Sequence, residues 1–150
     1  MNKRWTPRAT VAVVVEKDGK FLMVRERSGG REVFNQPAGH IEKDESILDA
    51  VRREALEETA WKIEPTAFLG MYILHAREKD VTYHRYAFVG EAHERTSQPI
   101  DDDILGTHWM TADELRARKS ELRSPLVLKC VEDCLAGRHL PLETIYEAEA

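Results

Sequence analysis

The chain has 150 residues, with 22 lysines and arginines against 27 aspartates and glutamates, which gives a formal net charge of −5. This length favours a single domain over residues 1–150, and the acidic balance argues against binding nucleic acid through bulk positive charge. The longest aliphatic run, Val11–Val15, is far shorter than the roughly 20 residues of a membrane-spanning helix. We therefore expect a cytoplasmic monomer with neither nucleic-acid nor membrane partners.

The first third of the chain has the pattern of paired strands. Thr10–Glu16 and Lys20–Arg27 are rich in β-branched and apolar residues, and Asp18-Gly19 lies between them. Asp-Gly tolerates positive φ at both central positions of a tight turn, so the pattern predicts a β-hairpin. Residues 28–31 are then expected to form a loop, and residues 34–39, with a proline and a glycine, an irregular crossing segment.

A long helix is expected next, from Glu45 to about Ala60, because this stretch lacks glycine and proline and is rich in good helix formers. Asp44 is the expected N-cap, and Pro65 should stop anything that continues beyond the helix. Residues 67–75 and 81–91 then have the composition of two strands, with a polar tip between them.

The remaining elements are a short strand and two helices. An acidic loop over residues 96–103 precedes the strand, which covers residues 106–110. Thr111 and Glu114 match a capping box that starts a short helix. Ser124-Pro125 is an N-cap followed by proline at the first helical position, and Gly137 should end that helix. Strands and helices therefore interleave, which predicts an α/β or α+β sandwich.

Acidic residues of the long helix lie where a helix normally buries apolar side chains. At 100° per residue, Val51 and Ala55 lie on the buried stripe, Glu54 and Glu58 fall on or beside it, and Glu57 is their neighbour. Like charges at these spacings repel one another, and burial adds a desolvation penalty. Mg²⁺ or Mn²⁺ can bind several carboxylate oxygens at once. The pattern indicates a divalent-cation site, and a solvated acidic helix face is the alternative.

The spacing of these residues is similar to the sequence box of the Nudix (MutT-like) hydrolases. That box reads glycine, five residues, glutamate, seven residues, Arg-Glu, two residues and Glu-Glu, and here its positions are Gly39, Glu45, Arg53, Glu54, Glu57 and Glu58. The chain departs from the box at Ala60 and Trp61, which stand where the family has a glycine and an aliphatic residue. Alanine is costly at a left-handed helix end, so the turn that follows the helix is the feature put in question.

The resemblance implies a Nudix α/β/α sandwich with a mixed β-sheet, and Mg²⁺-dependent hydrolysis of a diphosphate linked to another group. By position, Glu54, Glu57 and Glu58 would be metal ligands, together with the carbonyl of Ala38 and an acid of the later loop. That acid is Asp103 by first choice, with Asp101 and Asp102 as alternates. One of the helix acids, or the metal, would activate water. The expected catalytic residues are Glu57, Glu54, Arg53, which would orient the acids, and Glu45, which would support the join between loop and helix.

A narrower resemblance, to a bacterial phosphatase of the same family, extends from about Thr10 to Ile145. The similar stretches are residues 34–42, 122–127 and 141–143. This resemblance implies release of orthophosphate from nucleoside tri- and diphosphates, and from hydroxymethylpyrimidine diphosphate of the thiamine pathway. The alternatives are a Nudix pyrophosphohydrolase of nucleoside triphosphates or nucleotide sugars, and a noncatalytic module that binds a nucleotide.

Several further residues are candidates for contact with a small phosphorylated substrate. Arg25 and Arg27 alternate on a predicted strand and could face phosphates, although a solvated strand face would give the same pattern. Gln36 carries an amide suited to a base, and His40 follows the glycine of the box. Arg123 and Ser124 lie at a predicted helix N-terminus, which is a natural anion site. These residues complete the expected site: Arg25, Arg27, Gln36, His40, Arg123 and Ser124.

Overall fold

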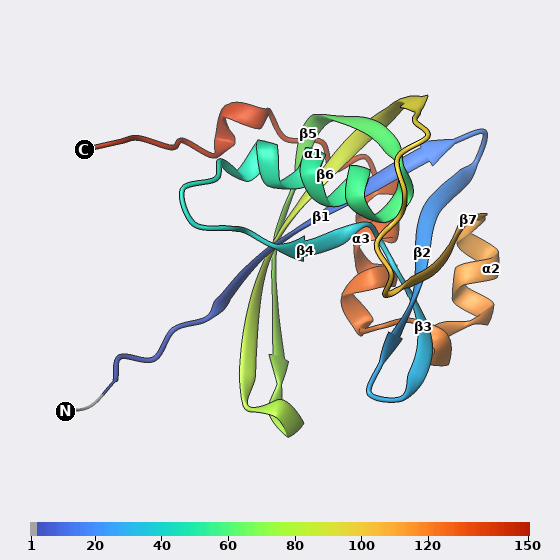
Figure 1. Ribbon diagram of the computed structural model, residues 1–150, viewed down its shortest axis with the longest axis horizontal. Helices are drawn as coiled ribbons and strands as arrows, with labels where there is room; N and C mark the ends of the chain where they lie inside the picture. Colours follow the sequence, from blue (N-terminus) through green and yellow to red (C-terminus); the bar gives the residue numbers. More distant parts are fainter. Residues whose placement is uncertain (1–2) are drawn as a thin grey trace.

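The computed structural model describes residues 3–150 (Figure 1). Its strands are β1 (Arg8–Lys17), β2 (Lys20–Ser28), β3 (Arg31–Asn35), β4 (Ala38–His40), β5 (Trp61–Ala76), β6 (Val81–Arg95) and β7 (Ile104–Met110). Its helices are α1 (Ile47–Thr59), α2 (Ala112–Ala117) and α3 (Pro125–Leu135), with 3₁₀ turns η1 (Arg77–Lys79), η2 (Lys119–Glu121) and η3 (Leu142–Thr144). Within the described residues, no helix is long and apolar enough to cross a membrane.

The seven strands form a mixed sheet in which β1 joins two halves. The main order is β3-β2-β1-β6-β5, with β4 beside β1 and β7 beside β2. Only β1 and β6 are parallel, and the remaining pairs are antiparallel. The end of β1 pairs with β2 through Glu16 and Lys17, whereas most of the strand pairs with β6. The two halves therefore diverge from β1, as Figure 1 shows.

Helices cover both faces of this sheet, which confirms the expected α/β/α sandwich with a mixed sheet. Along β1, Val11, Val13 and Val15 pack against the α1 side, and Val14 packs in the cluster that contains α2 and α3. This alternation follows from the two-residue period of a strand. Full burial of each valine stabilises the fold by roughly 1.5–3 kcal/mol. The sheet thus fixes α1 on one face and the start of α3 on the other.

The expected turns and caps are confirmed at three places. Asp18 and Gly19 have φ of 53° and 77°, as the hairpin between β1 and β2 requires. Thr111 forms a complete capping box with Glu114 at the start of α2. Ser124 caps α3, where its side chain accepts a hydrogen bond from the backbone N–H of Leu126.

The predicted start of the long helix was wrong by two residues. Ser46, not Asp44, is the N-cap of α1, and its hydroxyl accepts a hydrogen bond from the Asp49 N–H at 3.1 Å. Asp44 instead has φ of 64° in the exposed turn before the helix. The helix ends at Ala60 with φ of 64°, so this alanine does adopt the left-handed turn. Its backbone conformation is one that glycine adopts at lower cost.

Three strand boundaries also differ from the predictions. Residues 34–39 are not irregular, because β3 and β4 take up all but Gln36 and Pro37. The expected loop over residues 28–31 is a two-residue turn at Gly29-Gly30. Pro65 lies inside β5, at a shift of register with β6. A proline cannot donate to the ladder, and such an irregularity is where a strand tolerates it.

Candidate active site

The loop before α1 brings backbone groups close to the helix acids. Gly39 lies in β4, and a Cβ atom there would overlap the Glu54 carboxyl group. Only glycine therefore fits without displacing Glu54. On the far side of the loop, Glu45 accepts a hydrogen bond from the Glu42 N–H at 3.1 Å. The close approach of Gly39 to Glu54 and the hydrogen bond between Glu42 and Glu45 position the segment that leads into the helix.

Glu58 is the most buried of the helix acids, with 7% of its surface exposed. Its Oε1 accepts a hydrogen bond from the Ala38 N–H at 2.8 Å, which ties the last turn of α1 to β4. Burial raises the pKa of Glu58 to about 9, although this hydrogen bond acts in the opposite direction. Burial also raises the pKa of Glu54, and the ion pair with Arg53 partly offsets that rise. Both shifts arise because the protein interior disfavours the charged carboxylate.

Arg53 holds the other acids together. Its Nε and Nη2 donate to the two carboxylate oxygens of Glu45 at 2.6 and 2.9 Å, and its Nη1 donates to Glu54 at 2.8 Å and Glu57 at 3.3 Å. The fixed fork of a guanidinium suits this arrangement. The hydrogen bond from Arg53 lowers the pKa of Glu45. The same interactions, led by the hydrogen bond with Glu45, raise the pKa of Arg53.

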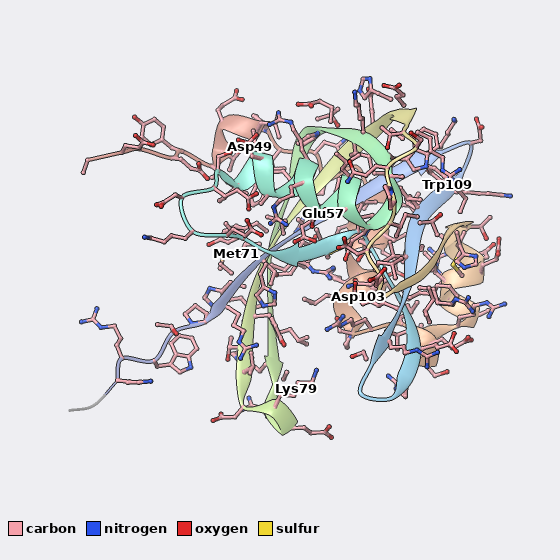
Figure 2. The ribbon with its side chains drawn as sticks, viewed as in Figure 1. Asp49, Glu57, Met71, Lys79, Asp103 and Trp109 are labelled. Carbon is pink, nitrogen blue, oxygen red and sulfur yellow. The ribbon has the colours of Figure 1, made fainter. Side chains whose placement is uncertain are left out.

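A cavity of about 570 Å³ lies beside these acids. Its walls come from α1, β4, the β5–β6 hairpin, the segment before β7 and the start of α3. Asp101 and Asp103 both line it, and the Asp101 N–H donates to the carbonyl of Glu57 at 2.9 Å. Figure 2 shows Glu57 on α1, Asp103 on the segment before β7, and Lys79 at the end of the hairpin. Asp102, the other alternate, is not among the lining residues.

The donors around this cavity fit a hard divalent cation. They are the carboxylates of Glu54, Glu57, Glu58, Asp101 and Asp103, and oxygen donors of this kind are the ligands that Mg²⁺ prefers. Within residues 3–150 no three acidic, histidine or cysteine side chains are already gathered into a metal cluster. Arg53 hydrogen-bonds to Glu54 and Glu57 in this arrangement.

Three of the predicted substrate contacts, His40, Arg123 and Ser124, line the cavity. Arg25 and Arg27, which are also predicted substrate contacts, are not among the residues that line it. Successive side chains of a strand point to opposite faces. On β2 the cavity side is occupied by Glu26 and Ser28, and Arg25 forms an ion pair with Glu32 at 3.2 Å outside it.

Gln36, which is predicted to contact a base, is also outside the cavity lining. The side chain is buried, and its Nε2 donates to the carbonyl of Val127 at 2.7 Å. Its Oε1 accepts a hydrogen bond from Arg85 at 2.9 Å. Gln36 therefore connects β6 and α3 to the segment between β3 and β4.

Several cavity residues were missed by sequence reasoning: Thr10, Glu26, Ser28, Leu74, Lys79 and Arg85. They come from elements far apart in the chain, so no local spacing brings them together. One signal was present, because Arg85 interrupts a strand that continues as Tyr86-Ala87-Phe88-Val89. A charged residue next to such an apolar run is a candidate for a buried site.

Comparisons with known proteins identify the family of this chain. Residues 5–130 match the family model described as NUDIX domain. The chain is 40% identical over 140 residues to Phosphatase NudJ of Escherichia coli K12 and of Shigella boydii, an alignment that covers 93% of this chain and 90% of either relative.

Solved structures extend the comparison to the fold. A NUDIX hydrolase from Nitrosomonas europaea matches with a TM-score of 0.92 and 38% identity, over 95% of this chain and 98% of that one. The NUDIX domain of Shewanella oneidensis NrtR, solved with ADP ribose, shares the fold at a TM-score of 0.69 and 18% identity, over 89% and 90% of the two chains. The chain therefore belongs to the Nudix family and is a hydrolase of phosphate anhydride bonds, similar to NudJ.

Proposed function

We propose that this protein is a Mg²⁺-dependent phosphatase that releases orthophosphate from nucleoside tri- and diphosphates and from hydroxymethylpyrimidine diphosphate. The observation that carries the proposal is the buried Glu58 and the partly buried Glu54 beside a cavity large enough for a nucleotide. The 40% identity to Phosphatase NudJ supports the phosphatase reading over other reactions of the family. Mn²⁺, which takes the same oxygen donors, is expected to substitute for Mg²⁺.

The metal would be held by Glu54, Glu57 and Glu58, with the carbonyl of Ala38 and the carboxylate of Asp103 completing the donor set. A bound Mg²⁺ neutralises charge on phosphate oxygens and lowers the pKa of a bound water. Phosphoryl transfer needs such neutralisation and positioning more than elaborate acid–base machinery. The remaining chemistry is assigned to side chains of this chain.

Glu57 is the acid best placed to take a proton from the attacking water. Its side chain is 36% exposed at the cavity, against 13% for Glu54. A base must reach the reacting group, so the more accessible carboxylate suits this role. Arg53 keeps Glu57 and Glu54 in place through its hydrogen bonds, and Glu45 in turn fixes the plane of Arg53.

The substrate would be bound by cavity residues outside the acid cluster. Arg123 and Ser124 lie at the start of α3, where a helix N-terminus favours anions. His40 lies about 6.4 Å from Tyr83, ring centre to ring centre, and both rings line the cavity. Such rings can pack against a nucleobase or a pyrimidine ring.

The decisive experiment separates the two phosphate products. Purified protein with Mg²⁺ is incubated with nucleoside di- and triphosphates, hydroxymethylpyrimidine diphosphate and a nucleotide sugar, and orthophosphate and pyrophosphate are measured separately. We expect orthophosphate from several diphosphates and its loss in EDTA. Pyrophosphate as the main product, or turnover of nucleotide sugars alone, would contradict the proposal in favour of a pyrophosphohydrolase. Tight nucleotide binding without turnover would identify a noncatalytic module.

A further inference from the structure

Arg85 is a cation buried in the wall of the cavity. It lies in the first half of β6 and is 7% exposed, and among residues 3–150 it is the only buried arginine or lysine. Its two terminal nitrogens donate to Gln36 Oε1 and Asn35 Oδ1, each at 2.9 Å. Nη1 also lies 3.9 Å from the sulfur of Cys130. All three partners are uncharged side chains.

The nearest acid on this side of the cavity is already paired. Glu26 Oε1 accepts from Arg123 at 2.7 Å and from the Asn35 amide at 3.3 Å. Arg85 is connected to that carboxylate only through Asn35, and it makes no ion pair of its own within the described residues. The Glu26 carboxylate is thus paired with Arg123 and not with Arg85. The cluster of Glu26, Asn35, Arg85 and Arg123 has one positive charge in excess.

A structural role alone does not account for this arrangement. A buried charge is expensive unless it is paired, and an apolar side chain of similar volume often replaces one without loss of stability. Asn35 and Gln36 instead direct their amide oxygens at Arg85 and hold its guanidinium at the cavity. A charge that is held in place but not neutralised is suited to an anion that arrives with the ligand.

We propose that Arg85 binds a phosphate oxygen of the substrate's diphosphate chain, with Arg123 beside it. This inference rests on the proposed function, because it takes the substrate to be a diphosphate whose other phosphate oxygens face the acids of α1. The cavity would then hold the diphosphate between an acidic wall, which carries the cation, and a cationic wall built on β6 and the start of α3. Arg85 would contribute to recognition of the phosphates, common to all the proposed substrates, and not of the base.

The test is calorimetric titration of the protein with inorganic pyrophosphate in the presence of Ca²⁺, which takes the same oxygen donors as Mg²⁺. Wild-type protein is compared with Arg85→Met and with Arg116→Met, a control that removes an exposed arginine paired with Asp113 and Glu132 on the surface. We expect Arg85→Met to weaken pyrophosphate binding about 10- to 100-fold, the effect of losing a hydrogen bond to a charged group. The control should bind as wild type does.

Arg85→Lys guards against a variant that fails to fold. Lysine keeps the positive charge but lacks the paired N–H donors of a guanidinium. We therefore expect a pyrophosphate binding constant between those of wild type and Arg85→Met, and a thermal unfolding temperature close to that of wild type. Equal pyrophosphate affinity in wild type and in a folded Arg85→Met variant would overturn the proposal. So would wild-type protein that does not bind pyrophosphate.

The titration does not depend on turnover, which separates this inference from the proposed function. Binding that requires Arg85, together with a negative result in the product assay, would refute the phosphatase and keep the phosphate contact. Orthophosphate release by wild type, together with unchanged binding by Arg85→Met, would refute the contact and keep the phosphatase.

Discussion

The burial of Glu58 predicts how the stability of the metal-free protein depends on pH. Burial raises the pKa of this carboxyl from its ordinary value of 4.5 to about 9 in the folded protein. Between these two values the folded state keeps a proton that the unfolded state has released. The free energy of unfolding therefore decreases as pH rises from about 4.5 to about 9.

The magnitude follows from one proton. A difference of one bound proton changes the free energy of unfolding by about 1.4 kcal/mol for each pH unit. From pH 6 to pH 8 the contribution of Glu58 is therefore a loss of about 3 kcal/mol. The matched variant is Glu58→Gln, whose amide oxygen can still accept the hydrogen bond from the Ala38 N–H. That variant cannot titrate at this position.

The assay is denaturant unfolding of both proteins in EDTA at pH 6, 7 and 8. The free energy of unfolding of wild type should fall relative to that of Glu58→Gln by about 1.4 kcal/mol per pH unit. With saturating Mg²⁺ the difference in slope should vanish, because a cation replaces the proton, and calorimetry at pH 7 should detect about one proton released per site. If the stability curves of the two proteins in EDTA are parallel, Glu58 does not retain a proton in the folded state and the prediction is wrong.

Three further substitutions test the geometry around the acids. Gly39→Ala places a methyl group on the Glu54 carboxyl. We therefore expect about 1–3 kcal/mol less stability in denaturant unfolding and at least a roughly tenfold fall in kcat/KM. Unchanged stability and unchanged kcat/KM would contradict the close approach of Gly39 to Glu54. Ala60→Gly relieves a left-handed alanine and should raise Tm by about 1–2 °C in a calorimetric scan, because strain relief exceeds the added entropy of the unfolded chain; a lower Tm would refute this. Arg53→Lys keeps the charge and loses the two-point contact with Glu45. In steady-state kinetics kcat should therefore fall about 100-fold with KM little changed. A rise in KM alone would argue against a positioning role for Arg53.

Local chemistry made several elements predictable from the sequence. Asp18-Gly19 specifies a tight turn through its tolerance of positive φ, and Thr111 and Ser124 specify helix starts through their hydroxyl groups. The burial of Glu58 and the partial burial of Glu54 also followed from spacing, since helical periodicity places them next to the apolar stripe that packs on the sheet.

The other wall of the cavity was not predictable in the same way. Strand periodicity leaves open which face of β2 lies toward the cavity, and in the structure Glu26 and Ser28 line the cavity while Arg25 does not. Arg85 bonds to Asn35 and Gln36, residues about 50 positions away in the chain. The apolar run after Arg85 hints at its burial, but tertiary arrangement decides its partners and no local spacing identifies them.

In the proposed mechanism, the acids of α1 that face the cavity form the catalytic centre. The most direct measurement is kcat of Glu57→Gln in the Mg²⁺ product assay, with Asp49→Asn as the control on the same helix. Asp49 forms an exposed ion pair with Arg52 and does not line the cavity, and Figure 2 shows it at the far end of α1 from Glu57. We predict that Glu57→Gln loses about 100-fold or more of kcat, the scale of a lost general base, while Asp49→Asn retains wild-type turnover. Equal turnover in wild type and a folded Glu57→Gln variant would contradict the account.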